Sequence, residues 1–275
     1  MGDNEAHEVF TEVNADLLEW FIADSEIQEE FSLPLRDYAC LLLGFDYEAQ
    51  ILAVRDLLRR NSNHEERTVA EIKELETRAQ RLTGVANEWA INEWIDRIHG
   101  SVYQDAAHSM AAVGMLAPLI ESIFSQAFQS MKRYFPSREN YPTHQRWMPA
   151  IKEEWDCHYV SLQAGKKKDI AEGIWQLADA VGLAALLPRQ TEDILKALFT
   201  YRNRMFHHGF EWPVEERERF ATLVKKWPSS WFQSSKTDED PWIFYLSDCF
   251  ITECMSLIDE TITALGHFAK TVHRS

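Results

Sequence analysis

The chain has 275 residues and a mass of 32.0 kDa, and 45% of its residues are hydrophobic and 12% aromatic. A chain of this length can bury a large core, and its 10 glycines and 9 prolines disfavour a β-sandwich or a glycine-rich nucleotide cradle. Its four cysteines do not form a disulfide framework, so we expect a reducing, cytoplasmic location. The N-terminus lacks a signal-peptide pattern and no apolar run reaches about 18 residues, so we expect no membrane span.

The formal net charge of −16 disfavours general binding to nucleic acid, but the charge is unevenly distributed. Residues 1–100 hold 22 Asp and Glu against 9 Lys and Arg. Residues 132–236 reverse this balance, with 13 acidic and 17 basic residues. The net charge is therefore no argument against an RNA substrate, but an RNA site on this chain must be local and preorganised.

Apolar residues recur at spacings of three and four along most of the first half of the chain. This period predicts amphipathic helices over 7–24, 35–60, 65–83, 85–99 and 104–135. Asn61-Ser62-Asn63 predicts a break between the second and third helices, and Pro118 predicts a kink in the last.

The second half continues in the same way after a loop over 136–149. We predict helices over 150–162, 168–185, 191–208, 214–227 and 242–270, with a polar loop over 229–240. The 191–208 helix has clear ends, because Thr191 can cap its N-terminus and Gly209 suits a left-handed conformation after its last turn.

No alternating strand pattern is visible, so the predicted fold is all-α, a multi-helix bundle. The charge shift and Gly100 place a boundary near residue 100. We therefore expect an acidic helical extension over 1–100 and a second helical domain over 101–275, with one continuous helical domain as the alternative.

Two isolated charges lie on strongly apolar helices. Arg202 falls within the apolar stripe of the 191–208 helix, three residues after Phe199 and four before Phe206. Glu121 is the only formal charge between Asp105 and Lys132. Because a lone buried charge is costly, we expect Glu121 and Arg202 to pair.

Polar side chains crowd the C-terminal end of the same helix. Asn203 and His207 are four residues apart, as are Arg204 and His208, so each pair shares a helix face. A helix C-terminus stabilises a protonated imidazole, and a guanidinium beside an imidazole can serve phosphodiester chemistry without a metal. Spacing alone is compatible with ordinary surface histidines.

The stretch Tyr201-Arg-Asn-Arg-Met-Phe-His-His-Gly209 resembles the signature helix of the HEPN superfamily, an Arg with a polar follower, four to six residues and then His. Arg202 matches the Arg and Asn203 the follower, while His207 fits a four-residue gap and His208 a five-residue gap. Glu121 is the position that matches the family's acidic residue on an earlier core helix. The resemblance covers residues 101–275, with the first hundred residues outside it.

The resemblance implies an all-α, metal-independent endoribonuclease that acts as a homodimer, as in toxin–antitoxin and phage-defence systems. It implies that His207 or His208 moves protons, that Arg202 stabilises the transition state and that Asn203 orients the phosphate or the histidine, with Glu121 and Arg204 in support. The implied partners are RNA, a second copy of the chain and an antitoxin or regulatory protein. No metal or cofactor is implied.

Two alternatives remain open. In one, the domain is a non-catalytic binding module in which Arg202 and Glu121 form a structural ion pair, since some family members have lost catalysis. In the other, the acidic N-terminal region masks the basic segment and regulates it.

Other segments carry weaker signals. Cys249 and Cys254 do not match a zinc spacing and are expected in the core, and Trp89 and Trp94 have core-type spacing. The adjacent pair Cys157-His158 would need spatial partners to act as a nucleophile. Lys166-Lys167-Lys168 is expected at a solvated helix start, with an RNA-backbone contact as the alternative.

Overall fold

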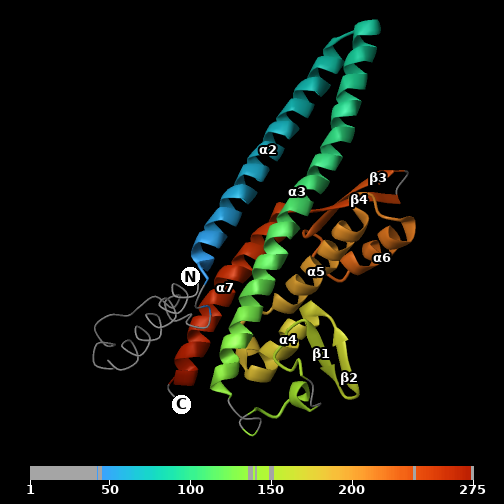
Figure 1. The fold of residues 1–275 in the computed structure, drawn as a ribbon. Helices are drawn as coiled ribbons and strands as arrows, with labels where there is room; N and C mark the ends of the chain where they lie inside the picture. Colours follow the sequence, from blue (N-terminus) through green and yellow to red (C-terminus); the bar gives the residue numbers. More distant parts are fainter. Residues whose placement is uncertain are drawn as a thin grey trace, which may run out of the picture.

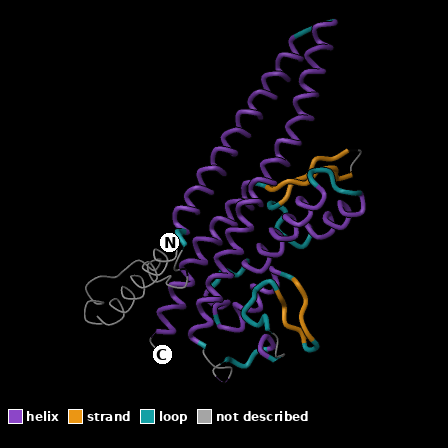
Figure 2. Tube along the Cα trace, viewed as in Figure 1, coloured by secondary structure: helices purple, strands orange, loops and turns teal. Residues whose placement is uncertain are grey.

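The computed structural model describes residues 42, 45–135, 139, 141–148, 152–237 and 240–273. The predicted 7–24 helix lies outside them. The described part is mostly helical, but it also contains two small antiparallel sheets of two strands each (Figure 2). The helical prediction is therefore confirmed in the main, and the expectation of no strands is wrong.

Two long helices, α2 (Tyr47–Arg81) and α3 (Val85–Met131), form an antiparallel hairpin whose far end projects beyond the other elements (Figure 1). The predicted breaks at Asn61-Ser62-Asn63 and Gly100 are both absent, because each helix continues through them. Contacts between α2 and α3 stabilise both helices, so each of them can continue through residues of low helix propensity. Arg97 of α3, for example, forms a 2.7 Å ion pair with Glu71 of α2.

The lower half of α3 is the central element of the core. It packs against α7 (Asp248–His273), α4 (Ile170–Val181) and α5 (Thr191–His208), and its buried face includes Leu116, Ile120, Phe124 and Phe128. The helix continues through Pro118. By length and composition α3 could cross a membrane, but 56% of its apolar window is buried inside the fold, which is compatible with the core helix of a soluble protein.

Helix α5 has the predicted bounds, 191–208. Its N-cap residue is Gln190 rather than Thr191, and no side chain caps this end. The other end falls at Gly209 as predicted, and its φ of 73° is one that glycine tolerates, but its ψ of −144° lies outside the expected left-handed helical conformation. Helix α4 is followed by a short 3-10 turn, η7 (Leu183–Leu186), and helix α6 (Val214–Val224) is slightly shorter than expected.

Residues 159–168 form a hairpin where a helix and the start of another were predicted. Strand β1 (Tyr159–Leu162) pairs with β2 (Gly165–Lys168), with Tyr159 opposite Lys168. The predicted 150–162 helix is therefore wrong. The Lys166-Lys167-Lys168 run lies on β2, where Lys166 pairs with Glu153 and Lys167 with Glu172.

A second hairpin replaces the predicted 229–240 loop and the start of the last helix. Strand β3 (Phe232–Thr237) pairs with β4 (Asp240–Leu246). The hairpin covers the aromatic residues between α5 and α6, and the Tyr201 hydroxyl of α5 donates to the Phe244 carbonyl at 2.9 Å. Burial of Phe244 and Ile243 on this surface outweighs the weak strand signal of the serine-rich β3.

Candidate functional site

The last two turns of α5 present the four residues that the sequence singled out. Arg202 is partly buried, while Asn203, His207 and His208 are exposed. The two imidazole rings lie 6.4 Å apart between centroids, and neither forms a hydrogen bond with any residue that the structure describes. The histidines therefore lie at the helix C-terminus with free ring nitrogens, open to solvent or to a ligand.

Arg202 forms the ion pair expected with Glu121 of α3. Its Nη1 donates to Glu121 Oε2 at 3.1 Å, and each side chain is 27% exposed. Its Nε and Nη2 both donate to Asn203 Oδ1, at 3.2 and 3.1 Å, and the guanidinium lies over the Phe199 ring. The guanidinium is thus held from two sides, and its partial exposure leaves it accessible to an anion.

Arg204 points away from this group. Its Nε lies 3.4 Å from Glu216 Oε2 of α6, and its guanidinium lies over the Phe220 ring. Burial lowers the pKa of Arg204, and the charge of Glu216 partly offsets this. Arg204 therefore fastens α6 to α5 and forms no hydrogen bond or ion pair with Arg202, Asn203 or either histidine, all of which the structure describes.

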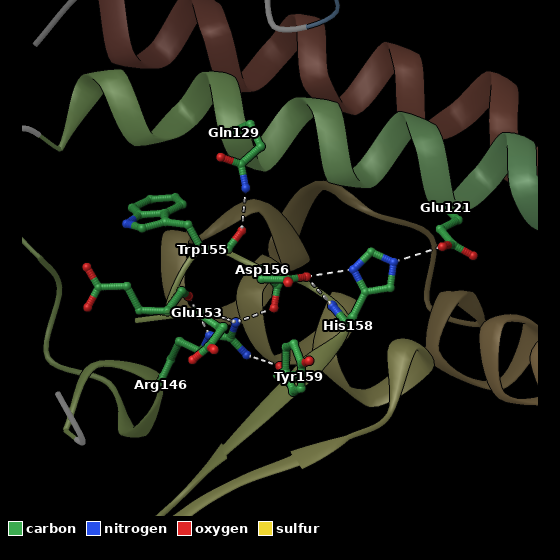
Figure 3. Close-up of polar contacts among 9 residues, drawn as sticks. Glu121, Gln129, Arg146, Glu153, Trp155, Asp156, His158 and Tyr159 are labelled. Atoms are coloured by element: carbon green, nitrogen blue, oxygen red, sulfur yellow. Dashed lines mark hydrogen bonds and ion pairs between the residues drawn. The ribbon is translucent and has the colours of Figure 1, made fainter. Parts of the chain in front are cut away.

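The structure adds a residue to the site that the sequence had not placed there. His158, in the turn before β1, contacts Glu121 Oε1 through Nε2 at 2.8 Å and Asp156 Oδ1 through Nδ1 at 2.6 Å (Figure 3). Burial lowers the pKa of His158, but the hydrogen bonds to Glu121 and Asp156 outweigh burial, so the pKa is raised. Glu121 is thus shared between an imidazole and a guanidinium, one on each carboxylate oxygen.

Arg146 holds the turn that carries Asp156 and His158. Its side chain is fully buried and lies in the short helix η6 (Gln145–Trp147). It donates to the carbonyls of Glu153, Glu154, Asp156 and Tyr159 and to the side chain of Gln176, and Figure 3 shows it beside the turn that carries Asp156 and Tyr159. Burial lowers its pKa to about 10, which leaves it charged at neutral pH. No helix can form over 152–158 while these carbonyls point at Arg146.

Helix α4 packs closely against the same turn at Gly173. A Cβ built on Gly173 would lie 2.9 Å from the Tyr159 carbonyl oxygen and closer still to that of Cys157. We expect Gly173→Ala to destabilise the protein by about 2 kcal/mol, because backbone on both sides must move. Gly100 in α3 is the matched control, since nothing lies within 4 Å of its Cβ position and Gly100→Ala should be neutral or stabilise by up to about 1 kcal/mol. Urea denaturation of the two variants compares them, and equal midpoints would contradict the close packing.

Asp156, Cys157 and His158 are also a candidate metal-ligating group, since their donor atoms lie within 4.8 Å of one another. The residues fit a metal poorly. Cys157 is buried, and burial raises its pKa to about 12, which opposes the thiolate that a metal needs. Both ring nitrogens of His158 are already engaged with carboxylates. We therefore derive no metal chemistry from this group.

Two of the four cysteine and tryptophan residues that the sequence placed in the core are exposed. Cys254 is buried as expected, but Cys249 is exposed at the start of α7. Trp94 is partly buried, whereas Trp89 on the projecting hairpin is 73% exposed, so its expected place in a core is wrong.

No family model, curated protein or solved structure matches the chain. The resemblance of the α5 motif to HEPN proteins accordingly stays a prediction from the sequence.

Proposed function

We propose that this chain is a metal-independent endoribonuclease of HEPN type. The observation that carries the proposal is the Arg202 guanidinium, held by Glu121 and Asn203, five and six residues before two exposed imidazoles. A fixed cation that can bind a phosphate, together with imidazoles that can accept and donate protons, is the minimum needed to cleave a phosphodiester bond without a metal.

In the proposed reaction the 2′-oxygen of a ribose attacks the adjacent phosphorus. One imidazole, His207 or His208, takes the 2′-hydroxyl proton, and an imidazolium gives a proton to the departing 5′-oxygen. Arg202 stabilises the negative charge on the phosphoryl oxygens, and Asn203 keeps the guanidinium in place. The products are a 2′,3′-cyclic phosphate and a 5′-hydroxyl, and every proton that leaves one group is received by another.

The proposal includes a cytoplasmic homodimer in which the ends of two α5 helices face one shared cleft. The support is that both imidazoles lie on an open surface, and neither of them lines the two cavities that the described residues form beside Tyr47 and beside Ile194. A second copy would enclose the phosphate and supply a second pair of histidines. A toxin or phage-defence role, with an antitoxin or regulatory partner, follows the same resemblance.

Removal of both histidines tests the catalytic role of the imidazoles. We expect His207→Ala/His208→Ala to reduce cleavage of a mixed RNA pool in EDTA by about 10²–10⁴-fold, because proton transfer by side chains is lost. The single variants identify which imidazole acts. His267→Ala is the matched control, since His267 is exposed on α7 and belongs to no part of the site. Cleavage by the double variant at the wild-type rate would contradict the proposal.

A specific observation favours the second candidate, a non-catalytic module. Each of the three nitrogens of the Arg202 guanidinium already donates to Glu121 or Asn203, as a structural ion pair requires. The regulatory reading, in which residues 1–100 mask the basic segment, needs a test other than deletion of those residues, because residue 100 lies inside α3 and the deletion would cut a core helix.

A further inference from the structure

We infer that His158 is a positioning residue that tunes the charge of the Arg202 site, so that the protonated imidazole favours binding of an RNA phosphodiester at Arg202. The inference rests on the proposed function for the identity of the ligand. It concerns regulation of that site by pH.

The hydrogen bonds of His158 set its protonation state. A carboxylate accepts hydrogen bonds and cannot donate them, so contacts of 2.8 Å to Glu121 and 2.6 Å to Asp156 each require an N–H on the ring. A ring with two N–H groups is an imidazolium. Two ionised carboxylates at these distances therefore favour the imidazolium form of a ring that is about a third exposed to solvent.

Glu121 transmits this charge to Arg202. Its Oε1 accepts a hydrogen bond from His158 and its Oε2 accepts one from Arg202 at 3.1 Å. The imidazolium and the guanidinium therefore share the negative charge of one carboxylate. When His158 loses its proton, Glu121 can no longer accept at both oxygens from charged donors, and Arg202 becomes its sole cationic partner among these contacts. A guanidinium that is more fully neutralised attracts a phosphate less strongly.

The other charges around His158 do not remove this effect. Asp156 shares its turn, Cys157 beside it is a buried neutral thiol, and Arg146 from η6 lies behind the turn with its donors directed at carbonyls and Gln176. Glu121 from α3 is the group between His158 and the α5 cation. Loss of one proton thus makes the whole cluster more negative by one charge.

The direction of the pH effect follows from the raised pKa of His158. The hydrogen bonds to Glu121 and Asp156 place this pKa above the ordinary value of 6.5, despite the burial that lowers it. The imidazolium and its contribution to folding are fully present below pH 6.5 and are lost as pH rises through the folded-state pKa. Phosphodiester affinity should fall over the same range.

The test measures binding of a 2′-O-methyl RNA oligonucleotide, which cannot be cleaved and whose phosphodiesters do not titrate in this range. His207→Gln/His208→Gln serves as the background, so that the exposed imidazoles do not contribute. We expect affinity to fall on the order of fivefold as pH rises past the His158 pKa, the effect of one charge acting across a partly solvated site. His158→Gln should bind weakly throughout and lack this pH step, and Asp156→Asn added to it should restore affinity because one negative charge is removed.

NMR titration of the His158 ring provides a readout without RNA and without any change at His158. Its pKa should fall in Glu121→Gln, which removes a carboxylate, and rise in Arg202→Ala, which removes a competing cation. A pKa below 6.5, a pKa unmoved in both variants, absence of oligonucleotide binding, or the same pH step in His158→Gln would overturn the inference. Failure of the wild type to cleave RNA would instead reject the proposed function. The binding and NMR results would still decide the inference about His158, because neither measurement depends on cleavage.

Discussion

Replacement of Arg202 by Ala is expected to abolish most RNA cleavage while leaving the fold nearly intact. Removal of one preorganised group that stabilises transition-state charge costs about 10²–10³-fold in turnover. The Arg202 guanidinium binds Glu121 and Asn203 together and is 27% exposed, so it is both fixed in place and accessible to a phosphate. Arg202→Lys should lose a smaller factor, since a lysine keeps the charge but not the fork.

The same variant separates the two candidate functions. A fully buried ion pair costs about 3–5 kcal/mol when one partner is removed, but Arg202 and Glu121 are each 27% exposed and Glu121 keeps His158 as a partner. We therefore expect Arg202→Ala to cost only about 1–2 kcal/mol, an ion pair with part of its charge in solvent. A thermal melt beside the cleavage assay measures both. A large loss of melting temperature in a wild type that never cuts RNA would favour the structural ion pair.

Replacement of Arg146 by Ala is expected to have the largest effect on stability. The substitution removes five hydrogen bonds made by a fully buried guanidinium and opens a cavity in the core, although the Glu153 and Asp156 carbonyls and the Gln176 side-chain oxygen each keep a backbone N–H donor. Loss of such a buried charged network costs about 3–5 kcal/mol. Urea or thermal unfolding measures this loss.

Arg59→Ala is the matched control for Arg146→Ala. Arg59 is 73% exposed and, among the residues that the structure describes, pairs only with Asp56 on the same helix, so its removal should cost less than about 1 kcal/mol. Amide exchange over 152–159 should also rise selectively in Arg146→Ala, because the turn loses its anchor. Equal stability of the two variants would show that Arg146 does not hold the turn that carries His158.

The predictions that succeeded came from strong local signals. The periodicity, the acidic first turn and Gly209 located α5 at its observed bounds. The expected Glu121–Arg202 pair is present because each residue was the isolated charge on an apolar helix face, and few other partners were available. Both inferences needed only the helical period and the cost of burying a lone charge.

The predictions that failed depended on contacts between distant segments. His158 meets Glu121 across 37 residues, and nothing local marks it as a partner. The helix expected over 150–162 is prevented by Arg146, whose burial depends on the tertiary fold. In the same way, the breaks expected at Asn61-Ser62-Asn63 and Gly100 are bridged because α2 and α3 support each other along the hairpin. At each of these places tertiary packing outweighed the local secondary-structure propensity of the sequence.

The most direct test of the account is identification of the RNA ends produced by the wild-type protein in EDTA. Attack by the 2′-oxygen with side-chain proton transfer predicts cleavage with 2′,3′-cyclic phosphate and 5′-hydroxyl ends, and no such products with Arg202→Ala. RNA that remains intact, or ends with a 5′-phosphate, would contradict the account.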